Sequence, residues 1–363
     1  MEVKRLTLKN FRNYTEETIE FSPRTNLIYG DNAQGKTNIL EAVYLAANGR
    51  SHRAKADTQM VKFDEEYARV QVEFADRHRT YKIVIGLLPG NKKSVKINDV
   101  PINKLSVLVN YLNVVMFSPE DLELIKGSPK MRRHFMDTAI SSLSPRYLSD
   151  LVTYHKVLAQ KNSLLRSAKF GNKKAQDNID VWNIQLAAAG VRIMKERQSF
   201  VEGLSKEAMP IHREIAGSML GIEYAPSFDL DILNEPNPEM SYIKRLEDVK
   251  QREIENGSAL YGIQRDEIRF FIDNNEAKIY ASQGQQRTIV LCMKLALTEY
   301  IKRRRDEYPV LLFDDIMSEL DEKHRRYLAD SIKDKQVLLT CTDKEESKAA
   351  RVIRIENGKA TLE

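Results

Sequence analysis

The eight residues from Gly30 to Thr37 constrain the fold of this 363-residue chain more than any other stretch. Their sequence, Gly30-Asp31-Asn32-Ala33-Gln34-Gly35-Lys36-Thr37, matches G-x4-G-K-[ST], follows a short apolar strand at 25–29 and precedes a helical pattern. Backbone N–H groups of such a loop close around phosphates, and the helix N-terminus adds its positive end. We therefore expect bound ATP, with Lys36 reaching the β- and γ-phosphates and the Thr37 hydroxyl ligating Mg²⁺.

The rest of the pattern predicts an α/β fold. Strands 68–74 and 81–87 alternate apolar and polar residues, which favours a half-exposed antiparallel sheet. From about residue 268, a strand, a helix near 284–305, a strand, a helix near 319–333 and a further strand follow one another. Such alternation is typical of a parallel sheet covered by helices.

A second acidic element follows the phosphate loop by nearly 280 residues. The apolar strand 310–313 ends in Asp314 and Asp315. Carboxylates at the end of a parallel strand lie where α/β sheets bind ligands. We expect Asp314 to contact Mg²⁺ and Asp315 to orient or deprotonate the attacking water.

The middle of the chain is helical and basic. Leu151, Leu158 and Leu165 fall seven residues apart, and a polar link at 167–178 joins two helical stretches. Between residues 126 and 197 there are 14 Lys and Arg against 5 Asp and Glu, although the whole chain carries only +5. This excess predicts contacts with DNA phosphates that are indifferent to sequence. The candidate DNA-binding residues are Lys130, Arg132, Arg133, Lys169, Lys173 and Lys174.

Other features exclude several classes of protein. No apolar run approaches the roughly 18 residues that span a bilayer, and the N-terminus lacks the apolar core of a secretion signal. Cys292 and Cys341 lie far apart in apolar runs, so we expect buried thiols rather than a disulfide or a metal site. We therefore expect a cytoplasmic protein that does not associate with membranes.

The order of motifs resembles that of ABC-type ATPases. Ser282-Gln283-Gly284 opens the helix before the acidic strand, as a signature motif does, 318–321 resembles the D-loop, and Thr342 ends the switch strand. This resemblance implies that Ser282 and Gly284 of one subunit close over ATP bound by another, with Thr342 near the nucleotide. One phosphate loop per chain then implies a homodimer in the ATP state.

Several stretches look like the RecF family of recombination mediators, and the resemblance spans the chain. They are LTLKNFRNY at 6–14, GDNAQGKTNILEAVYLA at 30–46, FSPEDLELIKGSPKMRRHFMD at 117–137, ASQGQQRT at 281–288 and LLFDDIMSELDEKHR at 311–325. The resemblance implies an ATP-stabilised dimer on double-stranded or gapped DNA, acting with RecR and RecO partners in DNA repair and replication-fork recovery. It also implies that Asp315, where most ABC ATPases carry glutamate, makes hydrolysis slow, with Lys36 as the other catalytic residue.

The same resemblance leaves two segments with two interpretations each and shows one departure from the family pattern. Arg12 is either a nucleotide contact or a surface arginine. The loop 118–121 either links nucleotide state to the helical lobe or simply caps a helix, and the segment 262–268 departs from the commoner family pattern. We expect an ATPase head at 1–115 and 260–363 and an inserted helical lobe at 116–259. A transporter ATPase subunit and a long-armed SMC-like clamp are the alternatives.

Overall fold

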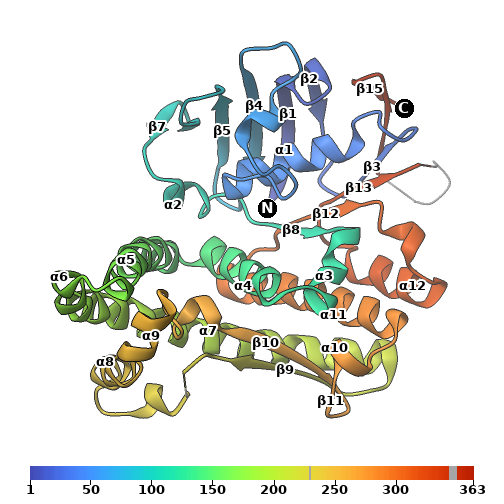
Figure 1. Ribbon diagram of the computed structural model, residues 1–363. Helices are drawn as coiled ribbons and strands as arrows, with labels where there is room; N and C mark the ends of the chain where they lie inside the picture. Colours follow the sequence, from blue (N-terminus) through green and yellow to red (C-terminus); the bar gives the residue numbers. More distant parts are fainter. Residues whose placement is uncertain (229, 343–349) are drawn as a thin grey trace. The chain divides into compact units, whose positions relative to one another are not determined.

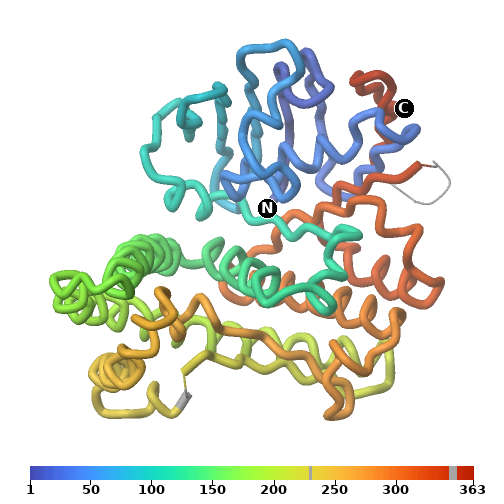
Figure 2. Tube along the Cα trace, viewed as in Figure 1, coloured from blue at the N-terminus to red at the C-terminus, as the bar shows by residue number. Residues whose placement is uncertain are grey.

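A computed structural model describes residues 1–228, 230–342 and 350–363. The chain divides into two compact units (Figure 1). Unit 1 comprises Met1–Leu122, Pro210–Gly217 and Gln283–Glu363, and unit 2 comprises Glu123–Met209 and Ser218–Ser282. Figure 2 shows that unit 1 is assembled mainly from the blue and red ends of the chain, whereas green to orange segments form unit 2.

Unit 1 contains the antiparallel sheet that the alternating strands predicted. Its order is β2 (Tyr14–Glu20), β1 (Glu2–Phe11), β4 (Ala68–Ala75), β5 (Thr80–Leu87), β6 (Ser94–Ile97) and β7 (Val100–Ile102). Along β4, Val70 and Val72 are buried while Arg69 is exposed, so only one face of the sheet joins the core. The prediction of half-exposed strands is confirmed.

The second sheet of unit 1 is parallel except at one edge. Its order is β15 (Lys359–Leu362), β14 (Arg351–Glu356), β3 (Thr25–Tyr29), β13 (Val337–Cys341), β12 (Val310–Asp314) and β8 (Val114–Phe117), and only β15 runs antiparallel to its neighbour. Every residue of β12 and β13 is buried, as expected of strands covered on both faces.

Helix α1 (Lys36–Asn48) joins the two sheets of unit 1. Its apolar side chains, among them Ile39, Leu40 and Val43, share one buried cluster with residues of β1, β4, β5, β12 and β13. The remaining helices of unit 1 are α2 (Leu105–Leu108), α11 (Gln283–Arg305) and α12 (Glu322–Ser331), with short 3-10 turns at Asp57–Met60, Pro119–Leu122 and Met317–Glu319. This core fixes the loop that precedes α1 against the ends of the parallel strands.

Unit 2 is mostly helical. It contains α3 (Glu123–Lys126), α4 (Pro129–Leu143), α5 (Pro145–Lys169), α6 (Lys173–Asp177), most of α7 (Ile179–Ala216), α8 (Pro238–Asp248), α9 (Lys250–Asn256) and α10 (Ala277–Tyr280), with 3-10 turns at Leu230–Asn234 and Ile263–Arg265. Arg192 on α7 pairs with Asp150 on α5 at 2.7 Å, so these helices form the expected hairpin. No helix among the described residues is long and apolar enough to cross a membrane.

One strand differs from the sequence-based expectation. The segment at 268–273, expected to open the parallel sheet, forms β10 (Glu267–Ile272), which pairs antiparallel with β9 (Leu220–Ala225) and with β11 (Asn275–Glu276) in unit 2. Unit 2 therefore extends to Ser282 rather than ending at residue 259. It begins after Leu122 rather than after residue 115, and Pro210–Gly217, which belongs to unit 1, interrupts its sequence. Strand–helix alternation along the chain did not reveal this because the partner of β10 lies about 45 residues upstream.

Candidate nucleotide-binding site

The candidate site lies at the carboxyl ends of four neighbouring parallel strands in unit 1. β3 leads into the loop that begins at Gly30, β12 ends at Asp314, β13 ends just before Thr342, and β8 ends just before Ser118. Because β3, β13, β12 and β8 are adjacent in the sheet, these four segments meet along one edge. This is the edge at which open α/β sheets bind ligands.

Two glycines shape the phosphate loop. Gly30 has a φ of 150° and a Cβ there would overlap the carbonyl oxygen of Ile355. Gly35 has a φ of 112° and a Cβ would lie 2.5 Å from the side-chain amide of Asn13. Gly35 is also the N-cap of α1 and provides no side-chain hydrogen bond. The first N–H groups of α1 therefore have no side-chain cap, which suits them to an anion.

The Lys36 side chain folds back over the loop. Its Nζ donates hydrogen bonds to the carbonyl oxygens of Gly30, at 2.5 Å, and Asp31, at 3.0 Å. The residue is only 8% exposed. The ammonium group is therefore held at the loop that would surround the phosphates, where the sequence predicted it.

A hydroxyl–carboxylate cluster joins the loop to β12. Thr37 Oγ1 donates to Asp314 Oδ1 at 2.8 Å, and Thr340 Oγ1 donates to the same oxygen at 2.9 Å. Hydroxyl and carboxylate oxygens are the donors that Mg²⁺ prefers, and one carboxylate suffices when phosphates and water complete the shell. The side chains of Thr37 and Asp314 therefore fit the predicted metal-binding role.

Asp315 adopts a strained backbone next to this cluster. Its φ is 51°, and its N–H donates to Thr340 Oγ1 at 3.1 Å. Burial raises the pKa of the Asp315 carboxyl, and Asp314 raises it further, while Lys36 acts in the opposite direction. A left-handed conformation at a residue other than glycine costs free energy and is common at functional sites.

Residues that the sequence reasoning did not single out brace the loop. Asn13 Nδ2 donates to the Gln34 carbonyl at 2.7 Å, and Asn38 Nδ2 donates to Asn13 Oδ1 at 2.9 Å. The Tyr14 hydroxyl donates to the Gly35 carbonyl at 3.1 Å. The stretch 6–14 contains Asn13 and Tyr14, but only the tertiary fold brings the turn between β1 and β2 against the loop.

Arg12 is held by a buried carboxylate. Its Nε and Nη2 donate to the two oxygens of Glu41 at 2.8 and 2.6 Å, and Nη1 donates to the Gln59 carbonyl. Burial alone would raise the pKa of the fully buried Glu41 carboxyl, but hydrogen bonds from Arg12 and Ser51 outweigh it and lower the pKa. Arg12 is thus more than a surface arginine, and its contact with nucleotide stays a prediction.

The proposed signature segment opens helix α11. Ser282 and Gly284 are exposed, and a Cβ at Gly284 would meet nothing within 4 Å. One turn later, Thr288 Oγ1 donates to the Gly284 carbonyl at 3.0 Å and lies 2.8 Å from His324 Nε2. His324 Nδ1 in turn lies 2.8 Å from Asp321 Oδ1, which connects the signature helix with the D-loop.

The loop at 118–121 acts as a local cap, and its expected link between nucleotide state and the helical lobe stays a prediction. Asp121 Oδ2 accepts the N–H of Ser118 at 2.8 Å, so the loop is a local cap. Asp121 Oδ1 also pairs with the buried Lys294 of α11 at 2.6 Å, which ties the loop to the signature helix. Thr342 is exposed beyond β13, and residue 343 lies outside the described residues.

The structure corrects part of the predicted DNA-binding set. Arg132 is 3% exposed and binds both oxygens of Glu267 at 2.6 and 2.7 Å, so its assignment was wrong. Arg133 is half-buried and donates to the Asp266 carbonyl, and burial lowers its pKa. The four lysines of the set, Lys130, Lys169, Lys173 and Lys174, are exposed.

The departing segment at 262–268 belongs to the core of unit 2. Asp266 is 1% exposed and accepts hydrogen bonds from Arg197 at 2.7 Å and from the Tyr224 hydroxyl. Gln264 Oε1 accepts the Tyr154 hydroxyl at 2.9 Å. These contacts hold unit 2 together and account for Gln264 and Asp266, whereas Arg265 is exposed.

Comparisons with known proteins agree with this arrangement. The family described as "RecF/RecN/SMC N terminal domain" matches residues 2–361. The DNA replication and repair protein RecF of Acetivibrio thermocellus is 42% identical over 95% of this chain and 94% of its own length, and that of Bacillus cereus is 38% identical over 100% and 99%. These matches leave no support for the transporter alternative.

Solved structures give the same result. The recombination mediator RecF with ATPrS, from the RecFOR pathway, superposes with a TM-score of 0.94 at 34% identity, covering 99% of this chain and 97% of the other. An Smc head bound to a winged-helix domain of ScpA reaches a TM-score of 0.58 at 18% identity, covering 100% of this chain and 97% of the other, which shows a shared fold alone. The predicted fold class, an ABC-type ATPase head, is confirmed.

Proposed function

Because this chain belongs to the RecF family of DNA replication and repair proteins, we propose that it is an ATP-gated, DNA-binding recombination mediator. The observation that carries the proposal is the exposure of the signature segment at Ser282 and Gly284. Gly284 opens the 23-residue helix α11, is exposed, and has open space around it. A second subunit can therefore bring its phosphates to this surface, and two ATP molecules join a homodimer.

Within each subunit, the residues already described divide the work on ATP. The N–H groups before and within α1 cradle the phosphates, and Lys36 turns from the carbonyls of Gly30 and Asp31 toward the β- and γ-phosphates. Thr37 and Asp314 would hold Mg²⁺, which supplies charge neutralisation at the phosphates. Asp315, at the exposed end of the cluster, orients or deprotonates the attacking water.

DNA would meet the helical unit along α5 and α6. Over its 25 residues α5 contains a single acidic residue, Asp150, which Arg192 neutralises. Its exposed cations, together with those of the following link, are Arg146, Lys156, Arg166, Lys169, Lys173 and Lys174. Such a face binds phosphates without reading bases and releases counterions when it does so. By analogy with the RecFOR relatives, the partners are gapped or double-stranded DNA and proteins of the RecR and RecO type.

Sedimentation velocity tests the dimer. Wild type and Asp315→Asn are run without nucleotide, with ATP, and with ATP and duplex DNA. We expect a dimer that ATP stabilises, that persists longer in Asp315→Asn because hydrolysis is removed, and that retains DNA. Ser282→Arg should bind ATP normally yet remain monomeric, because the longer arginine side chain would fill the space that the partner's nucleotide needs. A monomer of wild type and Asp315→Asn under every condition would refute the proposal.

Salt-dependent binding tests the α5–α6 face. Lys173→Glu with Lys174→Glu should lower the slope of log affinity against log salt by about 2, since each duplex phosphate contact contributes about 0.9. Lys206→Glu, an exposed lysine on α7 away from this face, is the matched control and should change the slope little. An unaltered slope in the double variant would remove this face from the proposal.

A further inference from the structure

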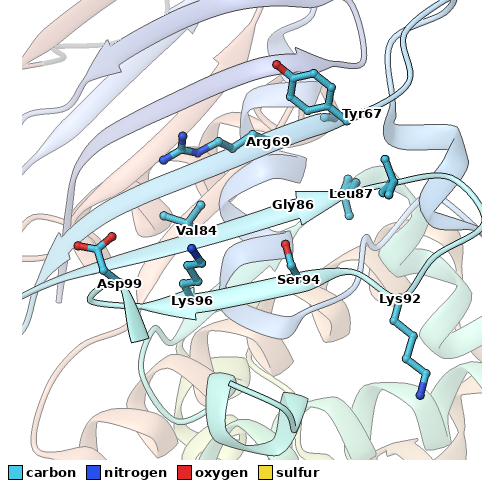
Figure 3. Close-up of a pocket in the computed structure, with 11 residues that line it drawn as sticks. Tyr67, Arg69, Val84, Gly86, Leu87, Lys92, Ser94, Lys96 and Asp99 are labelled. Atoms are coloured by element: carbon cyan, nitrogen blue, oxygen red, sulfur yellow. The ribbon is translucent and has the colours of Figure 1, made fainter. Parts of the chain in front are cut away.

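The outer face of the antiparallel sheet in unit 1 contains a hollow of about 440 Å³ over strands β4, β5 and β6 (Figure 3). Cross-strand register explains its position. Arg69 on β4 lies opposite Gly86 on β5, which in turn lies opposite Ser94 on β6. Glycine leaves the middle of this row without a side chain, and a Cβ there would lie 2.5 Å from Ser94 Oγ. The hollow therefore exists because residue 86 is glycine.

Hydrogen-bond donors converge on this hollow from two strands. In Figure 3, Arg69 and Lys96 lie on either side of Val84, and the Ser94 hydroxyl points in beside Gly86. Arg69, Ser94 and Lys96 are all exposed. Among the described residues, neither Arg69 nor Lys96 forms an ion pair, although Arg69 Nη2 donates a hydrogen bond to Gln71 Oε1 at 2.9 Å. The Asp99 carboxylate at the rim pairs with Lys82 at 2.7 Å and attracts both cations from a greater distance.

Two further cations lie near Arg69 and Lys96. Lys92 lines the same hollow, although its side chain points away from the other two cations. Lys9, opposite Arg69 on β1, places its ammonium group 5.6 Å from the ring of Tyr67 at the rim. Lys9 also lies opposite Glu16 on β2, which offsets part of its charge. Like charges on neighbouring strands, such as Lys9 and Arg69, lower the stability of a sheet, and a bound anion would relieve this repulsion.

We propose that this hollow, which we call the sheet-face site, binds backbone phosphates of DNA. The site rests on the proposed function and adds a DNA contact in unit 1 to the α5–α6 face of unit 2. Arg69 and Lys96 are two strands apart, which separates their backbones by roughly 10 Å. Successive phosphates of a nucleic acid can contact both side chains in turn, and the Ser94 and Tyr67 hydroxyls can donate to phosphate or sugar oxygens.

The geometry favours nucleic acid over an acidic peptide. Peptides that bind sheets commonly add a strand to a free edge. β4, β5 and β6 are each paired on both sides, so their main-chain groups are already used. Recognition at the site must therefore come from side chains alone, as it does for most phosphate contacts to DNA.

The test measures DNA binding of Arg69→Gln/Lys96→Gln by fluorescence anisotropy. The probe is a labelled duplex with a single-stranded overhang, titrated with and without ATP between 50 and 200 mM salt. Losing two phosphate contacts should lower the log–log salt slope by about 2 and weaken binding at 0.1 M salt by about tenfold or more. Arg5→Gln is the matched control, because Arg5 is exposed on the same sheet but pairs with Glu20, and it should bind like wild type.

A second variant separates the hollow from its charge. Gly86→Val/Ser94→Ala fills the hollow while every cation remains, and it should also weaken DNA binding. Circular dichroism and ATP affinity confirm that both variants fold. DNA binding by the filled variant equal to wild type, or by the charge variant with an unchanged slope, would overturn the site.

Two further results distinguish this site from the proposed function. A wild-type protein that binds no DNA in any nucleotide state would overturn both. If the wild type binds DNA and only the Lys173→Glu/Lys174→Glu variant loses affinity for it, the sheet-face site is overturned and the proposed function stays intact. If Arg69→Gln/Lys96→Gln loses binding to labelled polyglutamate but keeps its DNA affinity, the surface is a protein-binding one and the proposal is wrong.

Discussion

The contact between Arg12 and Glu41 permits a quantitative prediction for the Arg12→Ala variant. Glu41 is fully buried, whereas the Arg12 side chain is 23% exposed. Removing the arginine deletes two charge-assisted hydrogen bonds and leaves an uncompensated buried carboxylate that retains the Ser51 hydroxyl. Breaking a buried ion pair in this way costs about 3–5 kcal/mol in the free energy of unfolding. The opposite change, Glu41→Gln, should cost less, because water can reach the arginine that remains.

The loss should depend on pH with a defined sign. In wild type the pKa of Glu41 is lowered, so the pair contributes its full stability above the unfolded pKa of about 4.3 and loses it as pH falls through the folded pKa. Without Arg12, burial dominates and the pKa of Glu41 rises, so the variant loses stability as pH rises. The deficit of Arg12→Ala relative to wild type should therefore be largest near pH 8 and shrink toward pH 5.

Urea denaturation followed by far-UV circular dichroism measures this deficit. The single tryptophan, Trp182, lies on α7 in unit 2, so its fluorescence reports separately on the other unit. Arg12→Ala/Glu41→Gln should recover part of the stability at pH 8, because the stranded charge is gone. An Arg12→Ala variant within about 0.5 kcal/mol of wild type at pH 8, or a deficit independent of pH, would refute this reasoning.

Two further predictions concern unit 2. Lys161 and Glu253 form an ion pair at 2.6 Å with both side chains fully buried. Lys161→Met should destabilise by about 3–5 kcal/mol, whereas Lys161→Met/Glu253→Leu should unfold near the wild-type urea concentration; equal losses in both variants would contradict this. Gly262 has a φ of 121°, and a Cβ there would overlap the Tyr154 hydroxyl, whereas Gly171 has a φ of 87° with nothing within 4 Å. Gly262→Ala should therefore lower the thermal midpoint clearly more than Gly171→Ala, and equal shifts would show that the overlap relaxes without cost.

The elements that the sequence predicts correctly are those whose structure is determined by residues within a short stretch of the chain. The phosphate loop requires Gly30 and Gly35 at a fixed spacing, and both adopt positive φ as such a loop needs. Strand β12 reads as a continuous apolar run because both of its faces are covered. The prediction that α11 spans about 284–305 holds within one residue, because its apolar periodicity is long and uninterrupted.

What the sequence did not predict depends on contacts between distant residues. Asn13 braces the loop through the carbonyl of Gln34, and no local pattern marks that role. β10 has an ordinary alternating pattern that suits either kind of sheet, and only its pairing with β9 decides between them. Because α8 and α9 separate β9 from β10 in the sequence, the spacing of the strands does not indicate that these two pair.

The excess of Lys and Arg between residues 126 and 197 overestimates the exposed positive charge for a related reason. The surfaces at which we expect DNA to bind change as a result. Three cations of the basic segment, Arg132, Lys161 and Arg197, point into the core of unit 2. Among their partners are acids that lie beyond the segment, such as Glu253 and Glu267. Over the sequence of the whole unit, 22 Lys and Arg face 21 Asp and Glu, so unit 2 has no general excess of positive charge to offer.

The proposed attraction to DNA must therefore come from the local arrangement of cations, because screening restricts each exposed charge to about 10 Å at 0.1 M salt. Two surfaces meet this condition. One is the α5–α6 face, where Arg192 neutralises Asp150 and the exposed Asp177 is the other acid, and the second is the sheet-face site, where Asp99 is paired. The remaining 35 Lys and Arg and 31 Asp and Glu lie in unit 1, so neither unit dominates by net charge. Affinity divided between two such surfaces would fall only partly when either is neutralised, and combining the two sets of substitutions should lower the salt slope by nearly the sum of their separate effects.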